Sequence, residues 1–269
     1  MKRTDWNLAL SVGANAMNGE ALDALAAAGI HEIELSEGKL SGFSESLDSP
    51  TKARSYSDLA RAHDVTISSI HLPFGPFSQL DPSTNDPALR AFLLKTQGEL
   101  LRAAGDAGIG IAVLHPSGEP YPDGERQERL ERACEVVSQL TDVATESGIT
   151  LALENLPRTC LGRDSREMLY FLDRIPALRA CFDTNHSLRE DNIHFIRAIG
   201  SKIVTLHVSD YDGIDEKHWL PGEGVIRWEE LLCALEEVGY GGRFLYESGG
   251  FERHKAIRPN YEKIMGIRA

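Results

Sequence analysis

The sequence predicts an α/β protein, a single (β/α)8 TIM barrel that spans residues 1–269. The length favours this class, because barrels of this kind occupy roughly 250 residues as one domain. Short apolar runs alternate with longer stretches of helical periodicity from one end of the chain to the other, a pattern typical of repeated βαβ units. No linker or break in composition indicates a second domain.

Eight short apolar runs are the predicted strands. They cover residues 7–12, 32–35, 65–71, 109–115, 149–154, 178–183, 203–207 and 244–247. Helices are predicted over residues 19–28, 50–63, 86–107, 124–147, 164–174, 187–199, 227–238 and 251–267. Five of them are followed by a glycine that can close a helix, namely Gly29, Gly108, Gly148, Gly200 and Gly239. Because no dinucleotide-type G-x-G-x-x-G follows the first strand, the eight units favour a closed barrel over an open sheet.

The composition argues against several classes of protein. No run approaches the roughly 20 apolar residues of a membrane span. The first apolar run, which ends at Val12, is too short and too interrupted for a secretory signal. The formal charge of −13 opposes non-specific binding to nucleic acid, which needs a local excess of lysine and arginine. We therefore expect no membrane association, and the charge disfavours a nucleic-acid partner without excluding a local basic patch.

The spacing of the cysteines bears on whether the protein works in a reducing or an oxidising compartment. The four cysteines are widely spaced and include no C-x-x-C pair; they are Cys134, Cys160, Cys181 and Cys233. Neither a zinc clip nor a small disulfide framework is predicted from this spacing. We expect mostly buried thiols in a reducing cytoplasm. The number of subunits is not encoded in any recognisable pattern, so a homo-oligomer stays open.

Carboxylates and imidazoles stand where six consecutive predicted strands end. They are His71, His115, Glu154, Asp183 with His186, His207 with Asp210, and Glu247. In a β/α barrel these strand ends converge on the face that carries the active site, so we expect the side chains to meet. One polar strand end alone would indicate only a solvated rim, whereas six in succession indicate a site.

The last four of these strands end in Glu154, Asp183, His207 and Glu247, a mixed set of oxygen and nitrogen ligands. Such a set suits a divalent manganese, magnesium, cobalt or zinc ion and leaves coordination positions for a substrate. Glu154 and Glu247 flank the site, which suggests proton transfer on both faces of a bound carbon. A metal that holds a carbonyl and its neighbouring hydroxyl would stabilise the enediolate formed by proton removal. The place of reprotonation would then decide between an isomer and an epimer.

Taken together, these segments resemble the xylose isomerase-like barrel superfamily, which includes sugar isomerases and epimerases as well as apurinic-site endonucleases. The matching segments are IHLPF, VLHPSG, LALENLP, CFDTNHS, VTLHVSD, HWLPGEGVIRW and LYES, and they extend over nearly the whole chain. The resemblance implies Glu154, Asp183, His207 and Glu247 as metal ligands, with Glu154 and Glu247 also as the acid/base pair. It further implies that His186 and His218 touch a small carbohydrate substrate, and that His71 and His115 line the rim of its site.

Two features depart from the ketose 3-epimerases of this superfamily. The place of His218 resembles an arginine position in those enzymes. The loop after Glu154 carries a further acidic residue there, where this chain has Cys160. Gly222 and Gly224 in HWLPGEG can form a tight loop that presents His218 over the metal. The sequence therefore predicts a metal-dependent isomerase or epimerase without specifying a ketose 3-epimerase.

Two alternative activities stay open within the same superfamily. A lyase of the inosose or dehydroshikimate dehydratase type needs the same metal-stabilised enolate but expels a hydroxyl group. The apurinic-site endonuclease branch binds additional zinc at positions that match His71, His115, Glu216 and His218. Against the endonuclease stand the acidic balance and Glu216, where that branch has aspartate. No basic, aromatic-rich loop for gripping a duplex is evident either.

Several further residues are weaker candidates. Arg158 could meet a substrate carboxylate or phosphate through its forked donors, or lie exposed to solvent. Ser248, Gly249 and Gly250 precede the last helix, where barrels often bind phosphate, with Arg253 close by. Glu34 ends the second strand and faces either the pocket or the rim. Trp6 and Phe74 form either an apolar wall over a sugar ring or part of the core.

Overall fold

Eight parallel strands form the centre of the protein. The computed structural model describes residues 2–36 and 50–267. The strands are β1 (Leu8–Val12), β2 (Glu32–Ser36), β3 (Thr66–His71), β4 (Ile111–Leu114), β5 (Thr150–Glu154), β6 (Arg179–Asp183), β7 (Ile203–His207) and β8 (Phe244–Tyr246). Each predicted strand is present within two residues of its predicted start and one residue of its predicted end.

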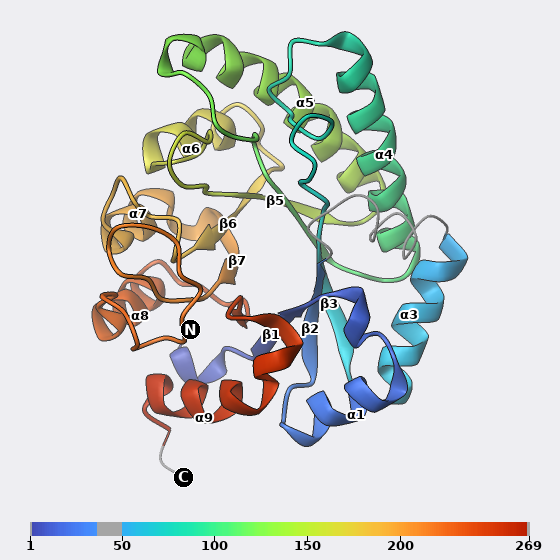
Figure 1. The fold of residues 1–269 in the computed structure, drawn as a ribbon, viewed down its shortest axis with the longest axis vertical. Helices are drawn as coiled ribbons and strands as arrows, with labels where there is room; N and C mark the ends of the chain where they lie inside the picture. The colour runs from blue at the N-terminus through green and yellow to red at the C-terminus, as the bar shows by residue number, and fades with distance from the viewer. Residues whose placement is uncertain (1, 37–49, 268–269) are drawn as a thin grey trace.

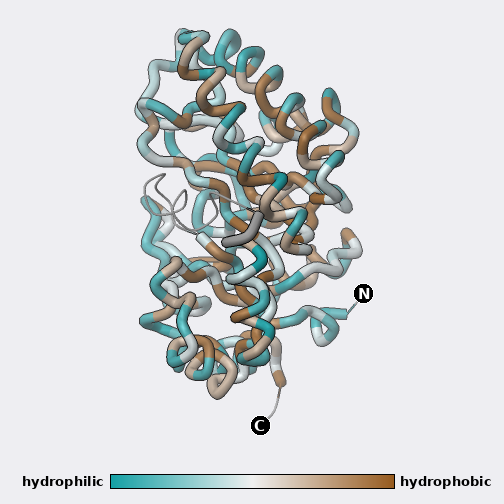
Figure 2. The backbone as a smooth tube through the Cα atoms, turned by 90° about the vertical axis from the view of Figure 1, so that its right-hand side faces the viewer, coloured by the Kyte–Doolittle hydropathy of each residue, from teal (hydrophilic) through white to brown (hydrophobic). Residues whose placement is uncertain are grey.

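Helices surround the strands on the outside (Figure 1). They are α1 (Gly19–Ala27), α3 (Pro50–Ala62), α4 (Pro87–Asp106), α5 (Arg126–Glu146), α6 (Ser165–Leu172), α7 (Asn192–Ile199), α8 (Trp228–Glu237) and α9 (His254–Met265). Figure 2 shows hydrophobic segments through the middle of the molecule and outer helices that alternate between hydrophobic and hydrophilic residues. None of the helices in the described ranges is both long and apolar enough to cross a membrane.

The sheet closes into a barrel at the carboxyl ends of β7 and β8. Hydrogen-bonded neighbours run in the order β7-β6-β5-β4-β3-β2-β1-β8. Just beyond β7, Val208 bridges to Tyr246 in parallel register. The Val208 amide donates to the Leu245 carbonyl at 2.8 Å, and the Glu247 amide donates to Val208 at 3.0 Å. The barrel predicted from the sequence is therefore confirmed, with a short closing contact.

Two helices, α7 and α9, begin three or more residues later than predicted, and each delay has a local cause. Asp191 caps α7 by accepting from the amides of Ile193 and His194, so that helix starts at Asn192 and not at residue 187. Before α9 the chain makes a 3-10 helix, Gly250–Arg253, which follows the left-handed Gly249. Polar caps and glycine turns thus decide where these helices start, because the apolar periodicity alone extends past them.

A small apolar layer lies beneath the polar strand ends. Val113, Ala152 and Cys181 form a separate buried cluster inside the barrel. Because side chains alternate along a strand, each of these residues points the same way as the residue two positions later. Those later residues are His115, Glu154 and Asp183. The side chains that point into the barrel therefore change from apolar to polar within two residues at the ends of β4, β5 and β6.

Candidate active site

The polar strand ends meet in one cavity at the carboxyl end of the barrel. The cavity has a volume of about 250 Å³. Its lining includes five of the strand-end residues named in the sequence analysis: His71, His115, Glu154, His186 and Glu247. Two other candidates, His218 and Arg158, reach it from the loops. Asp183 and His207 lie below it and are fully buried. The convergence expected from the strand ends is thus present.

Glu154 is at the centre of this cluster and contacts four histidines. Its Oε2 lies 3.1 Å from the Nε2 atoms of both His71 and His115. Its Oε1 lies 3.1 Å from Nδ1 of His207 and 3.3 Å from Nδ1 of His186. The side chain is only 1% exposed. Burial opposes its ionisation, but the positive imidazoles hold the pKa of Glu154 well below its usual range.

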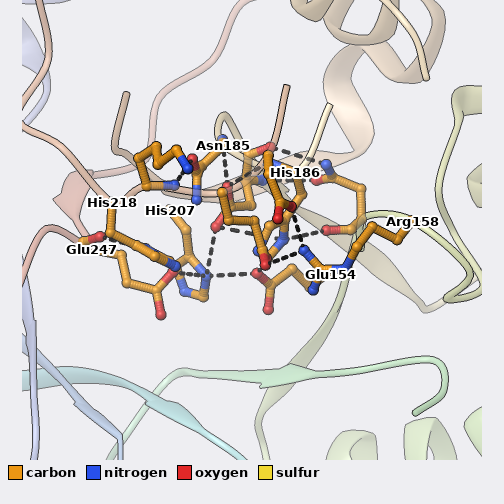
Figure 3. A network of polar contacts seen from close by, with 12 residues as sticks. Glu154, Arg158, Asn185, His186, His207, His218 and Glu247 are labelled. Carbon is orange, nitrogen blue, oxygen red and sulfur yellow. Dashed lines mark hydrogen bonds and ion pairs between the residues drawn. The ribbon is translucent and has the colours of Figure 1, made fainter. Parts of the chain in front are cut away.

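Three more ligand-type side chains lie close to Glu154, and Figure 3 labels two of them, His207 and Glu247. Nδ1 of His207 lies 3.4 Å from Glu247 Oε2 and 4.0 Å from Asp183 Oδ2. One ligand atom from each of Glu154, Asp183, His207 and Glu247 lies within 4.8 Å of the others. We call these four residues the inner group. They are the four ligands predicted from the sequence, and the barrel brings all of them together.

The inner group fits a divalent cation on two grounds. Asp183 Oδ2 is buried and has no hydrogen-bond partner in the described part of the chain, although the Asn185 and His186 amides donate to Oδ1 of the same carboxylate. Burial raises the pKa of Asp183 to about 7, and the nearby Glu247 and Glu154 add to the rise while His186 opposes it. A carboxylate oxygen without a partner and three acidic groups around one imidazole are what a cation would satisfy.

Three histidines of the cavity are anchored by backbone carbonyl groups. The partner of Nδ1 is Leu72 O for His71 at 2.8 Å, Asn155 O for His186 at 2.9 Å, and Glu247 O for His218 at 3.0 Å. With Nδ1 held by a carbonyl, the second ring nitrogen is left for the cavity. This arrangement orients the rings for contact with a metal ion or a substrate oxygen.

His186, Glu216 and His218 form a second cluster of ligand-type atoms, which we call the outer group. Nε2 of His186 lies 2.7 Å from Glu216 Oε1. Burial would raise the pKa of Glu216, but His186 and Arg158 lower it to about 2. The outer group is less buried than the inner group, because Glu216 and His218 belong to the loop between β7 and α8.

Arg158 joins the loops on one side of the cavity. Its Nε donates to Glu119 at 3.0 Å, and its Nη1 donates to Asp215 at 2.7 Å and to Glu216 at 2.6 Å. The side chain is 38% exposed, so the two interpretations from the sequence, substrate contact and solvent exposure, are both compatible with its place. Its donors are directed at carboxylates of the protein. Arg158 therefore acts on the cavity through Glu119 and Glu216.

An aromatic wall faces this charged side. The ring of Phe74 stacks on His115 with centroids 4.4 Å apart, and Phe77 lies beside it at 6.3 Å. Phe74 thus lines the cavity, as one of its two interpretations from the sequence requires. Trp6 does not, because it is 1% exposed before β1 and its Nε1 donates to Tyr240 O at 2.9 Å. The prediction that Trp6 forms part of a wall over a sugar ring is wrong, since residues before β1 lie at the opposite end of the barrel. Trp6 belongs to the core, which was its other interpretation.

Asp210 organises the loop that carries His218. Its carboxylate accepts from the amides of Gly222 and Ile226 and from the indole of Trp228. A Cβ at Gly224 would lie 2.2 Å from Tyr211 O, so only glycine fits there. The sequence indicated the glycines of this loop, and Asp210 as a polar strand end, but not that this carboxylate holds the loop together.

The predicted phosphate-binding segment is largely engaged with the protein. The Ser248 hydroxyl donates to Val208 O and to Trp219 O, both at 3.2 Å. The Arg253 side chain folds against Gly249, with its Cδ 2.9 Å from where a Cβ would be. Of the residues that the sequence did not single out, Glu119 joins the site most directly. No local pattern marks it, because its role depends on Arg158 from another loop.

The comparison with protein families decides what kind of barrel this is. The model of the family described as xylose isomerase-like TIM barrel matches residues 22–264. The chain belongs to this family. The resemblance drawn from its strand-end segments is therefore confirmed, and it covers nearly the whole chain.

Individual members of the xylose isomerase-like family are only moderately similar. The uncharacterized protein MJ1311 of Methanocaldococcus jannaschii is 28% identical over 229 residues, which cover 81% of this chain and 77% of that protein. The D-psicose 3-epimerase of Ruminiclostridium cellulolyticum is 27% identical over 198 residues, or 70% of this chain and 65% of that enzyme. The crystal structure of a D-tagatose 3-epimerase-like protein superposes with a TM-score of 0.78 at 22% identity, covering 96% of this chain and 98% of that protein. This last likeness shows the shared fold.

Proposed function

We propose that the protein is a metal-dependent isomerase or epimerase that acts on a sugar, a sugar acid or a sugar phosphate. The observation that carries the proposal is the inner group, in which two carboxylates, Glu154 and Glu247, lie 3.1 Å and 3.4 Å from His207 Nδ1. The chain also resembles enzymes named fructoselysine 3-epimerase, D-psicose 3-epimerase and inosose isomerase. Those names support an isomerase or epimerase reaction and leave the substrate open.

Glu154, Asp183, His207 and Glu247 would hold the divalent ion. When bound, the ion would polarise the substrate carbonyl and balance the charge that develops when the neighbouring carbon loses a proton. Manganese, magnesium, cobalt and zinc all suit these oxygen and nitrogen donors. The choice among them depends on geometry that the ligand types alone do not set.

The two carboxylates differ in how free they are to move a proton. Glu247 is 28% exposed at the cavity, and within residues 2–36 and 50–267 its carboxylate pairs only with His207, so we assign it as the group that removes or returns the proton. Glu154 is fully buried among four histidines, and its lowered pKa makes it the weaker base. We expect Glu154 to act mainly as a ligand and to exchange a proton with substrate on the opposite face.

The residues around the cavity would bind the substrate. His71, His115, His186 and His218 present ring nitrogens that can contact hydroxyl groups, and Arg158 would set the place of Glu216 at the edge. The ring of Phe74 offers an apolar face for the carbon side of a sugar. A small carbohydrate matches a cavity of about 250 Å³.

The test is a screen of metal-reconstituted protein against ketoses, inososes and sugar acids in deuterated water. An accepted substrate should gain solvent deuterium at the carbon next to its carbonyl. Elemental analysis without bound metal, combined with unchanged turnover under chelation, would remove the proposal. A product that has lost water would instead point to the lyase of the inosose or dehydroshikimate dehydratase type.

An apurinic-site endonuclease is the second candidate, and one observation favours it. His71 and His115 share Glu154 Oε2, and the outer group offers another set of ligand atoms, so the cavity contains donors for more than one metal ion. The charge of −13 opposes it, because duplex binding draws on positive surface. Cleavage of an abasic-site oligonucleotide by protein that holds three metal ions per chain would establish this activity instead.

A further inference from the structure

Glu34 is a buried carboxylate that lies outside the inner and outer groups. It stands on β2, is 0% exposed, and does not line the cavity. A carboxylate is expensive to remove from water unless another group compensates its charge. The surroundings of Glu34 should therefore reveal what compensates it.

Two side chains contact this carboxylate. Oε1 lies 3.0 Å from Nε2 of His207, and Oε2 accepts from the Ser69 hydroxyl at 3.0 Å. Neither Glu34 Oε1 nor His207 Nε2 has a partner with hydrogen-bond geometry among the described residues, so their 3.0 Å ion-pair approach is the polar contact that the structure gives each atom. The carboxylate oxygen and the ring nitrogen thus depend on one another.

The two ring nitrogens of His207 face different partners. Its Nδ1 faces Glu154 at 3.1 Å and Glu247 at 3.4 Å, while its Nε2 faces Glu34. A proton on Nε2 that points at Glu34 leaves the lone pair of Nδ1 for a cation. We propose that Glu34 is a positioning residue that keeps His207 in this tautomer and directs Nδ1 at the metal.

The other histidines show what is particular to this arrangement. His71, His186 and His218 are anchored by neutral backbone carbonyls, whereas His207 is anchored by a full negative charge. A carboxylate on the remote nitrogen makes an imidazole a more basic ligand and fixes its ring. The charged anchor is therefore placed on the histidine of the inner group, at the end of β7.

Glu32 provides a matched control on the same strand. It lies two residues before Glu34 and pairs with Arg243 and with Asn7, and no described contact joins it to His207. Replacing it removes the same charge from the same strand without touching His207. Ser69→Ala provides a second control, because it removes one hydrogen bond from Glu34 and keeps the contact with His207.

The test measures metal affinity and the tautomer of His207, and it rests on the metal centre of the proposed function. Zinc or manganese is titrated into metal-free protein in competition with a chromophoric chelator. Glu34→Gln should weaken binding by about 10-fold and Glu34→Ala by up to about 100-fold, the range found when a remote partner of a ligand is removed. Glu32→Gln and Ser69→Ala should stay within about twofold of the wild type by the same reasoning.

Long-range proton–nitrogen spectra of zinc-loaded protein report the protonated ring nitrogen of each of the nine histidines. In the wild type His207 should carry its proton on Nε2, and in Glu34→Ala this preference should weaken. Unchanged affinity in both Glu34 variants, or a proton on Nδ1 in the wild type, would overturn the inference. A wild-type protein that binds no metal would sink the proposed function and, with it, the role assigned to Glu34, whereas a wild type that binds metal with unchanged affinity in the Glu34 variants would overturn the inference alone.

Discussion

The inner and outer groups of the cavity use similar side chains on different kinds of support. Three members of the inner group end strands β5, β6 and β7, and Glu247 directly follows β8. In the outer group, Glu216 and His218 stand on the long loop after β7, and His218 has a φ of +49°. Positive φ is costly for residues other than glycine, so the loop must be held by its own contacts.

The difference teaches where precision comes from in this barrel. The inner ligands inherit their spacing from the register of the strands, which main-chain hydrogen bonds along each strand hold in place. The outer ligands depend on contacts between loops: Glu216 pairs with Arg158, and Nδ1 of His218 faces the Glu247 carbonyl. Changes in the inner group should therefore affect chemistry, whereas changes in the outer group should affect how substrate is placed.

The largest effect is expected from Glu247→Gln. This change keeps the shape of the side chain and removes the base, so turnover should fall on the order of 10³-fold while substrate still binds. Solvent deuterium incorporation and a binding assay on the same protein separate the two quantities. Glu252→Gln, on an exposed glutamate five residues further along, is the control. Full activity in Glu247→Gln would remove this residue from the chemistry.

Glu154→Gln tests whether Glu154 acts mainly as a metal ligand, in contrast to Glu247 as the base. Because its carboxylate contacts four histidines, its loss should reduce turnover to a similar extent and weaken metal binding as well. Metal content per chain, measured alongside activity, distinguishes a ligand from a base. If Glu154→Gln retained both metal and turnover, the inner group would have to be redefined without it.

The inner group could be predicted from sequence because it depends on strand ends alone. Glu154, Asp183 and His207 each close an apolar run, Glu247 lies one residue beyond its strand, and the fold brings all four together. The contacts of Arg158 could not be predicted in this way. Its partners come from loops that follow β4 and β7, and nothing in a single sequence indicates that these loops meet. The wall with Trp6 was wrong for a different reason, because its place just before the first predicted strand already puts it at the end of the barrel opposite to the site.

The next effect concerns the pH dependence of stability in the metal-free protein. Burial lowers the pKa values of His186 and His207, but their neighbours outweigh it and raise both above the usual range. These neighbours are carboxylates around His186, and Cys181 followed by carboxylates around His207; burial also raises the pKa of Asp183. A histidine whose pKa is higher in the folded than in the unfolded protein adds its full stabilisation below about pH 6.5. This stabilisation is lost as the pH rises through the pKa of the folded state. A raised aspartate pKa likewise favours the folded state at lower pH. Both shifts predict lower stability at higher pH.

The melting temperature measured with a chelator should therefore fall by roughly 5 °C between pH 6 and pH 8.5, since one pKa unit corresponds to about 1.4 kcal/mol. With a divalent ion present the slope should reverse, because the ion competes with protons for the same ligands. Asp183→Asn should flatten the metal-free slope. A melting temperature that rises with pH in the chelated protein would contradict the assigned shifts.

A smaller effect is expected in the outer group from His218→Gln. The variant should raise KM about tenfold and leave the inner metal in place, because His218 would contact substrate and not the inner ion. Lys217→Gln, which changes the neighbouring residue that pairs with Asp212, is the control. If His218→Gln instead lowered the number of metal ions per chain, the outer group would be a metal site and the endonuclease would gain support.

The smallest effect is expected from Arg158→Lys. Lysine keeps the charge but cannot contact both oxygens of Glu119 and reach Glu216 with one planar fork. Since the side chain is 38% exposed and its ion pairs are screened by water, KM should rise only about threefold and kcat should stay nearly constant. Raising the salt concentration should bring the wild type closer to the variant. Arg163→Lys, whose partner Asp123 is more exposed, provides the matched control. A loss of turnover as large as that of Glu247→Gln would mean that Arg158 meets the substrate itself and that the outer loops take part in the chemistry.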